Sequence, residues 1–225
     1  YEMSASLVGS EMCIRDRKRK VGYMFQDYAL FPHMNVVQNI EAGMGKRPDR
    51  AVTVYGNLIR RTYKHTPMIL GGIEASLRRL SHYDYWSDQV RRSVLLDSGA
   101  DLISYGMGEH SILEIAEALQ SGIPVQEITY VAGTVFKSHD ISRVYDPVVL
   151  PSFEQVQTDK KAYADSFAIQ YRNTDPFTAK PLAESYGNRG YVIQNPPSQP
   201  LTQMEMDDVY DLPYCLLYTS PSPRD

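Results

Sequence analysis

The chain has 225 residues, of which 43% are hydrophobic and 22% are charged, and its formal net charge at pH 7 is −4. This composition is typical of a globular domain with a hydrophobic core. The small negative charge indicates no electrostatic surface for nucleic acid. No apolar run approaches the roughly 20 residues that a membrane-spanning helix needs. We therefore expect neither a nucleic-acid partner nor a membrane partner.

Residues 18–43 show the first regular pattern along the chain. The apolar run at residues 21–25 predicts a strand, and Asn35 is placed to cap a short amphipathic helix that reaches Ile40. One strand and one short helix cannot bury a hydrophobic core by themselves. We therefore expect residues 1–43 to pack poorly against the rest of the chain.

Residues 46–214 alternate between extended and helical patterns. Apolar runs at residues 68–70 and 100–105 predict strands, and each is followed by glycines and then by a helical pattern, at residues 75–80 and 112–119. Repeated units of strand, glycine loop and helix are typical of parallel strands joined by crossover helices. The pattern therefore predicts an α/β fold with a Rossmann-like, partly parallel sheet.

Further elements complete the expected order. The patterns predict a helix over residues 47–65, a strand at 93–96, a hairpin over 128–136 that turns at Gly133, a helix over 153–171, a loop over 173–187, a strand at 191–193, and a last helix capped by Thr202 with Glu205.

Two glycine-rich loops form the candidate binding site. Loops of this kind, at the carboxyl ends of strands, are where open α/β sheets bind ligands. The candidate ligand-binding residues are Gly71, Gly72, Glu74, Gly106, Gly108 and Glu109. The alternative is that the glycines only form tight turns and that both glutamates interact with helix N-termini.

Two polar groups allow a functional and a structural interpretation. Residues 82–86 (HYDYW) form either a substrate- or domain-docking surface or ordinary aromatic packing with satisfied polar ends. Arg78, Arg79, Arg91 and Arg92 either bind an anion or a partner domain, or lie solvated on helix faces. The sequence shows no histidine pair at metal-ligand spacing and no Ser/His/Asp arrangement.

The two ends of the chain resemble translated adapter DNA. Residues 215–225 (CLLYTSPSPRD) and 7–16 (LVGSEMCIRD) can be encoded by opposite strands of one DNA stretch, which resembles the transposase adapter of sequencing libraries. We interpret residues 1–17 and 215–225 as adapter-derived tails. Cys13 and Cys215, the two cysteines, both lie in these tails, so the sequence between them offers no thiolate ligand. Because the sequence between the tails has no cysteine and no signal peptide, we expect the protein in the cytoplasm.

Residues 18–45 resemble the glutamine-loop region of ATP-binding-cassette ATPases. The resemblance rests on FQDYALFPHM at residues 25–34 and QNI at residues 38–40. In that family the loop glutamine, which matches Gln26, helps to hold the catalytic magnesium ion and water. The sequence has no phosphate loop of the form G-x-x-x-x-G-K-[ST]. We therefore interpret this segment as a fragment of another gene.

Residues 45–214 resemble the N-terminal domain of YgiQ-type radical SAM proteins. The motifs that carry the resemblance are GKRPDRA at 45–51, VYGNLIR at 54–60, GGIEASLRR at 71–79, HYDYWS at 82–87, LDSGAD at 96–101, YGMGE at 105–109, NTDPF at 173–177 and QNPPS at 194–198. In such proteins a downstream C-x-x-x-C-x-x-C motif binds a [4Fe–4S] cluster, which in turn binds S-adenosylmethionine. The chain ends before such a motif, so we expect it to hold no catalytic residue, no metal ligand and no cofactor of this kind.

The resemblance implies an accessory N-terminal domain whose partner is the radical SAM barrel of the same parent chain. The sheet is then expected to be incomplete at its N-terminal edge, because residues 18–45 replace the start of the family's domain. The glycine loops also resemble those of cobalamin-binding domains, although the chain lacks a D-x-H-x-x-G pattern. Two alternatives stay open: a small-molecule or cobalamin-like ligand-binding module, and an ATP-binding subunit of a transporter.

Overall fold

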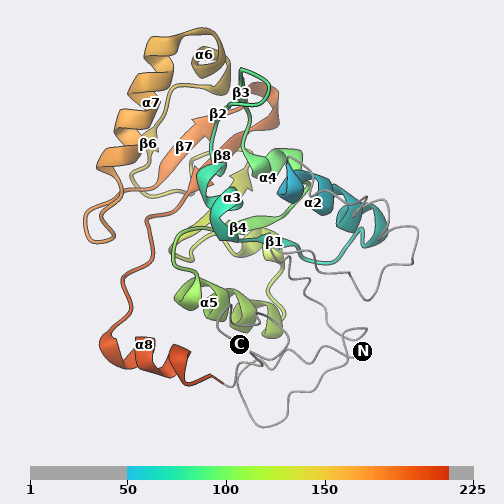
Figure 1. Cartoon of the computed structure of the whole chain (residues 1–225), viewed down its shortest axis with the longest axis vertical. Coiled ribbons are helices and arrows are strands. Elements are labelled where there is room, and N and C mark those ends of the chain that lie inside the picture. Colours follow the sequence, from blue (N-terminus) through green and yellow to red (C-terminus); the bar gives the residue numbers. More distant parts are fainter. Residues whose placement is uncertain (1–49, 213–225) are drawn as a thin grey trace, which may run out of the picture. The chain divides into compact units, whose positions relative to one another are not determined.

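A computed structural model of the chain describes residues 50–212 (Figure 1). The chain divides into two units, and the described residues 50–199 belong to one and 200–212 to the other. The adapter-like tails and the ATPase-like segment at residues 18–45 lie outside the described residues. The helices are α2 (Ala51–Thr62), α3 (Gly72–Leu77), α4 (Val94–Asp97), α5 (Glu109–Gln120), α6 (Phe153–Thr158), α7 (Lys160–Arg172) and α8 (Gln203–Tyr210), with 3-10 turns at Val125–Glu127 and Gly187–Arg189.

The sheet of the larger unit has six strands in the order β1-β4-β5-β8-β7-β6. The strands are β1 (Ile69–Leu70), β4 (Leu102–Ser104), β5 (Thr134–Ser138), β6 (Val148–Val149), β7 (Leu182–Ser185) and β8 (Tyr191–Gln194). The pairs β1·β4 and β6·β7 are parallel, and the other three pairs are antiparallel. The mixed sheet and its crossover helices confirm the predicted α/β class with a partly parallel, Rossmann-like sheet.

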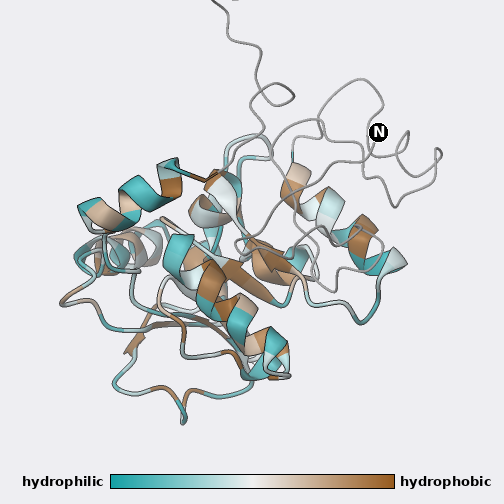
Figure 2. Cartoon of the chain, turned by 90° about the horizontal axis from the view of Figure 1, so that it is seen from below, coloured by the Kyte–Doolittle hydropathy of each residue, from teal (hydrophilic) through white to brown (hydrophobic). Residues whose placement is uncertain are grey.

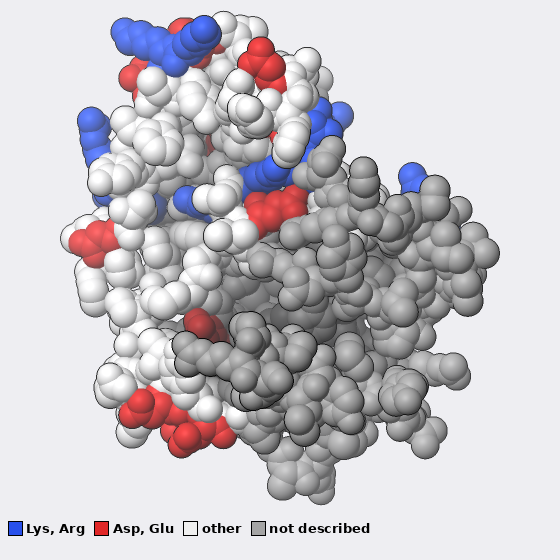
Figure 3. Space-filling view, in the orientation of Figure 1, with Lys and Arg blue, Asp and Glu red and all other residues white. Residues whose placement is uncertain are grey.

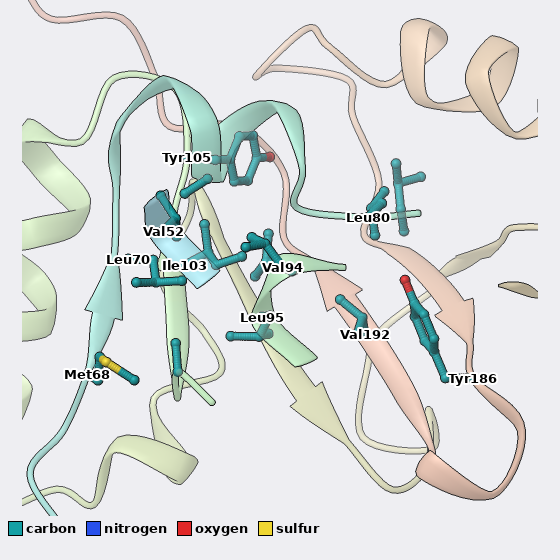
Figure 4. Packing of buried hydrophobic residues seen from close by; sticks show 14 of the residues in the cluster. Val52, Met68, Leu70, Leu80, Val94, Leu95, Ile103, Tyr105, Tyr186 and Val192 are labelled. Carbon is teal, nitrogen blue, oxygen red and sulfur yellow. The ribbon is translucent and has the colours of Figure 1, made fainter. Parts of the chain in front are cut away.

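Both faces of the sheet are apolar. Neighbouring strand residues point to opposite faces, and the pairs Ile69/Leu70, Leu102/Ile103 and Val192/Ile193 are each divided between two hydrophobic clusters. One cluster contains residues of α2, α3 and α4 (Figure 4), and the other contains residues of α5. Figure 2 shows the hydrophobic strands lying between the helices. Burial on both faces explains why these strands read as short, unbroken apolar runs.

Two sequence motifs form one joint between α2 and the segment before β4. An ideal Cβ on Gly56 would lie 2.8 Å from Ser98 Cβ, so glycine permits the close approach of the two segments. Asn57 Nδ2 donates to the Asp97 carbonyl at 2.8 Å. Arg60 donates to Asp101 Oδ2 at 2.6 Å and to the Gly99 carbonyl at 2.9 Å. These residues of the motifs VYGNLIR and LDSGAD therefore stabilise the fold.

Two predictions of extended structure, at residues 93–96 and 128–136, are wrong. Residues 93–96 form the start of α4, because the Ser93 side chain accepts a hydrogen bond from Leu95 N at 3.2 Å and caps the helix. A short apolar run does not distinguish a buried strand from a buried helix. The predicted hairpin at 128–136 is absent from the described chain: β5 begins at Thr134 and pairs with β4 and β8 instead.

Other predicted boundaries also change. The helix expected over 153–171 is two helices, because Asp159 ends α6 and its side chain caps α7. The loop expected over 173–187 contains β7, and a hairpin of β2 (His82–Asp84) and β3 (Gln89–Arg91) was not predicted. The predictions of α2, β1, β4, α5 and β8 are confirmed within a few residues. The capping box of Thr202 and Glu205 at α8 is also confirmed.

Candidate functional site

The two predicted glycine loops lie at one edge of the sheet. Strands β1 and β4 are adjacent and parallel, with Ile69 opposite Leu102, so their carboxyl ends lie side by side. The loops that follow these strands meet, because Gly106 N donates to Ser76 Oγ at 3.2 Å. We call residues 71–77 and 105–109 the glycine-loop edge. The structure therefore brings the predicted glycines together.

Backbone geometry accounts for three of the glycines. Gly72 and Gly106 have φ angles of 83° and 69°, in the left-handed region that disfavours residues with a Cβ. An ideal Cβ on Gly108 would lie 3.1 Å from Ser104 Oγ. Gly71 differs, because its φ of −142° is open to any residue and an ideal Cβ would lie 3.9 Å from the nearest atom. A Cβ at position 71 would therefore make only an ordinary van der Waals contact, so neither backbone nor sterics requires a glycine there.

The two glutamates of the loops have different surroundings. Glu74 accepts from Arg78 Nη1 at 3.0 Å, and its other carboxylate oxygen lies 3.4 Å from Val52 N at the start of α2. Glu109 lies in the first turn of α5. Within residues 50–212, its Oε2 atom is buried and has no hydrogen-bond partner. An unpaired buried acceptor is costly, so Glu109 is the better candidate for contact with a ligand or a partner.

A third motif, QNPPS, joins this edge from β8. Asn195 Nδ2 donates to the carbonyls of Thr129 and Val131, both at 2.9 Å, and the Asn195 carbonyl accepts from Tyr105 Oη at 2.6 Å. Arg79 reaches the same region, because its Nε donates to Gln194 Oε1 at 2.7 Å. The motifs GGIEASLRR, YGMGE and QNPPS therefore form one connected structure. Sequence reasoning did not find this connection.

Burial changes the acid–base properties of two residues there. Burial lowers the pKa of Arg79, and nearby Tyr105 partly opposes this change. Burial also raises the pKa of Tyr105, and Arg79 partly opposes that change. The guanidinium carbon of Arg79 lies 4.8 Å from the centroid of the Tyr105 ring, in a cation–π contact. Tyr105 is therefore a neutral phenol near pH 7, as its hydrogen bond to the Asn195 carbonyl requires.

The glycine-loop edge also exposes large apolar side chains. Ile73 and Leu77 lie one turn apart on α3 and are 68% and 71% exposed, and Met107 in the second loop is 47% exposed. Tyr130, on the segment that Asn195 holds, is 62% exposed. A group of exposed apolar residues around one edge is typical of a surface that contacts another protein or domain.

A buried carboxyl group lies on the face of the sheet covered by residues 78–81. Glu184 of β7 is fully buried and accepts from Ser81 N at 2.8 Å, from the Ser81 hydroxyl and from the Tyr186 hydroxyl. Burial raises the pKa of Glu184 even though these hydrogen bonds oppose the change. Tyr186 in turn accepts from Ser93 N at 3.0 Å. The sequence gives no local signal for this group, because Glu184 stands next to Ser185 in a segment predicted to be a loop.

The part of the chain between residues 50 and 212 shows no group of three or more His, Cys, Asp or Glu that could hold a metal ion. A helix long and apolar enough to cross a membrane is likewise absent from this part.

The chain is similar to proteins of one family. The family model described as "Radical SAM N-terminal" matches residues 38–221. A UPF0313 protein of Clostridium botulinum is 51% identical over 174 residues, which are 77% of this chain. A UPF0313 protein of Methanocella arvoryzae is 48% identical over 179 residues, or 80% of this chain, and one of Clostridium perfringens is 47% identical over 176 residues, or 78%.

The matched region is a small part of these relatives. It covers 27%, 30% and 26% of the C. botulinum, M. arvoryzae and C. perfringens proteins, so the chain spans less than a third of their length. No solved structure matches the chain.

Proposed function

This chain belongs to the radical SAM N-terminal family, and on that premise we propose that residues 50–212 serve as an accessory domain of a longer radical SAM protein. The relatives are more than three times as long as the matched region, which supports a further domain in the parent protein. The accessory domain would lie against the substrate side of that catalytic domain. We also place the parent protein in the cytoplasm.

The residues of this domain do not fit the cofactor of the parent family. A [4Fe–4S] cluster is held by cysteine thiolates, and residues 50–212 contain no cysteine. We therefore propose no reaction step within the domain. Its contribution to catalysis is to shape and close the site of the parent protein.

The observation that carries the proposal is the exposed apolar surface of the glycine-loop edge. Ile73, Leu77 and Met107 lie on two loops that the hydrogen bond from Gly106 N to Ser76 Oγ joins. An edge with exposed apolar side chains suits a permanent contact with a neighbouring domain. Glu109 supplies a buried carboxylate oxygen without a partner between residues 50 and 212, which a donor of the catalytic domain would satisfy.

Anaerobic reconstitution with iron and sulfide tests whether the chain lacks a reaction centre. The expected result is no stable four-iron absorption band and no cleavage of S-adenosylmethionine. The full-length C. botulinum relative serves as the matched positive control. A stable cluster bound with four irons per chain would contradict the proposal.

A second candidate function is a ligand-binding module at the glycine loops. A glycine at position 71 that the backbone does not require, and the Glu109 oxygen without a partner among residues 50–212, favour this alternative. Titration of the chain with cobalamins and nucleotides would show saturable binding that Glu109→Gln weakens. Absence of binding to both the chain and the full-length relative would reject it. The same nucleotide titration tests the transporter ATPase alternative, whose segment lies outside the described residues.

A further inference from the structure

A separate cleft on the larger unit is rich in arginine. It has a volume of about 780 Å³, within the range of small-molecule sites. We call it the arginine cleft. Its lining includes Arg50, Arg78, Arg91 and Arg92, together with His82. Figure 3 shows basic side chains beside an acidic patch near the position of α4 in Figure 1.

Ion pairs hold the four guanidinium groups of the cleft in place. Arg91 Nε donates to Asp84 Oδ2 at 2.8 Å, and Arg50 pairs with the same oxygen. Arg78 pairs with Glu74 at 3.0 Å, and Arg92 pairs with Asp97. The carboxylates fix the guanidinium groups before any ligand arrives, which lowers the entropic cost of binding.

The charges in this cluster do not balance. Counted over residues 50–212, four guanidinium groups pair with three carboxylates, those of Asp84, Glu74 and Asp97, so one positive charge is in excess in this part of the chain. Burial would raise the pKa of Asp84, but hydrogen bonds from Ser87, Arg50 and Arg91 outweigh burial and hold that pKa well below its usual range. Asp84 is therefore charged at neutral pH, and the excess is a single positive charge even with every acid ionised.

Donors remain available in the cleft. The pairs of Arg78 and Arg92 each use one guanidinium nitrogen, whereas a guanidinium group carries five N–H donors. Both side chains are partly exposed, at 22% and 31%. Arg50 Nε also has no hydrogen-bond partner among residues 50–212, but it is buried, so the accessible donors are those of Arg78 and Arg92. The cleft thus presents several fixed donors and a net positive charge to one concave space.

The walls of the cleft also have an apolar side. Val54, Val90, Val94 and Phe153 line it together with the arginines. We propose that the arginine cleft binds a small organic anion that carries a phosphate group. A guanidinium group can donate two parallel hydrogen bonds to two oxygens of a phosphate. The valines and Phe153 would contact the organic part of the ligand. The cleft borders the glycine-loop edge, because Arg78 pairs with Glu74, but this proposal does not depend on the accessory-domain proposal.

Titration of the full chain with inorganic phosphate and with phenyl phosphate, at constant ionic strength, tests this proposal. Isothermal calorimetry gives affinity, and the His82 imidazole resonance reports binding in the cleft. We expect saturable binding of both, with phenyl phosphate tighter because its ring contacts the apolar wall. Arg92→Gln should weaken the affinity for phenyl phosphate by about 10-fold, which corresponds to the loss of one charge-assisted hydrogen bond. The affinity of Arg92→Lys should lie between those of the parent chain and Arg92→Gln, because lysine keeps the charge but not the bidentate geometry.

Arg61→Gln is the matched control, because Arg61 is exposed on α2 and does not line the cleft. The affinity of Arg61→Gln for phenyl phosphate should stay within about two-fold of that of the parent chain. If Arg92→Gln does not fold, Arg78→Gln carries the same expectation. Failure of either phosphate to saturate, or equal weakening by Arg61→Gln, would overturn the proposal. If the cleft binds an acidic protein segment instead, the titrations with inorganic phosphate and phenyl phosphate would not reach saturation.

Discussion

Arg79 Nε donates to Gln194 Oε1 at 2.7 Å, across 115 residues of sequence. The contact joins the end of the GGIEASLRR motif to the start of QNPPS. Arg79 also donates to the Ser76 carbonyl at 2.6 Å and lies over the Tyr105 ring. One side chain thus links α3, the residue after β4 and the end of β8, and it fixes the base of the glycine-loop edge.

Replacing Arg79 should destabilise the chain. Arg79→Met keeps much of the side-chain volume but leaves Gln194, which is 2% exposed, without its donor. A buried polar group that loses its partner costs about 1–3 kcal/mol. Urea unfolding should show a loss of that size, whereas Arg61→Met, at an exposed position, should change stability by less than about 0.5 kcal/mol. Equal stability of both variants would show that the Arg79 contacts do not stabilise the fold.

Gly56 should not tolerate a side chain. An ideal Cβ there would lie 2.8 Å from Ser98 Cβ and 2.9 Å from the Ser98 carbonyl oxygen, and the latter is backbone that cannot rotate away. Gly56→Ala should therefore lower the free energy of unfolding by about 1–3 kcal/mol. Gly71→Ala is the control, because its Cβ meets nothing closer than 3.9 Å. Thermal unfolding that ranks Gly71→Ala below Gly56→Ala would contradict the geometry.

Glu184 should make stability depend on pH. Burial raises the pKa of this carboxyl in the folded state above its unfolded value of about 4.3. The protonated form is therefore favoured on folding, so this contribution is complete below the unfolded pKa and is lost as pH rises through the folded pKa.

Glu184→Gln removes that titration and provides the measurement. The difference in unfolding free energy between the parent chain and Glu184→Gln should move in favour of the variant as pH rises from 4 to 8. Asp84, whose pKa is held low, titrates in both proteins and cancels in this difference. Parallel stability curves for the two proteins across that range would exclude a raised pKa at Glu184.

The apolar side chains of the glycine-loop edge should not stabilise this chain by itself. Leu77 is 71% exposed, so Leu77→Asp should change stability by less than about 0.5 kcal/mol. Leu80, three residues on, is 2% exposed, and Leu80→Ala should cost about 2–5 kcal/mol. Denaturant midpoints of the two variants test the contrast. A large loss for Leu77→Asp would mean that Leu77 already packs within the chain.

The sequence was informative where local pattern and tertiary structure agree. Strand β4 and helix α5 follow from a short apolar run, two glycines and a 3.6-residue period. The glycine loops were placed at one edge because β1 and β4 were expected to be parallel, and they are.

The sequence was uninformative where distant contacts decide. Residues 93–96 carry an apolar run that suits a strand, but Ser93 caps a helix there and also bonds to the distant Arg79 carbonyl and Tyr186 hydroxyl. Strand β7 was missed because its prolines indicated a loop over residues 173–187, and Glu184 is buried there because Ser81 N and the Ser81 and Tyr186 hydroxyls donate to it. The Arg79–Gln194 contact and the arginine cleft depend on segments that no local pattern brings together.

The accessory-domain proposal is tested most directly by hydrogen exchange on this chain and on the full-length C. botulinum relative. The amides of residues 71–77 and 105–109, and their counterparts in the relative, are compared, with residues 160–172 of α7 as the reference. We predict that the glycine-loop edge exchanges at least about 10-fold more slowly in the full-length protein, while the rates in α7 stay similar. Equal exchange of the glycine-loop edge in the two proteins would contradict contact between this edge and the catalytic domain.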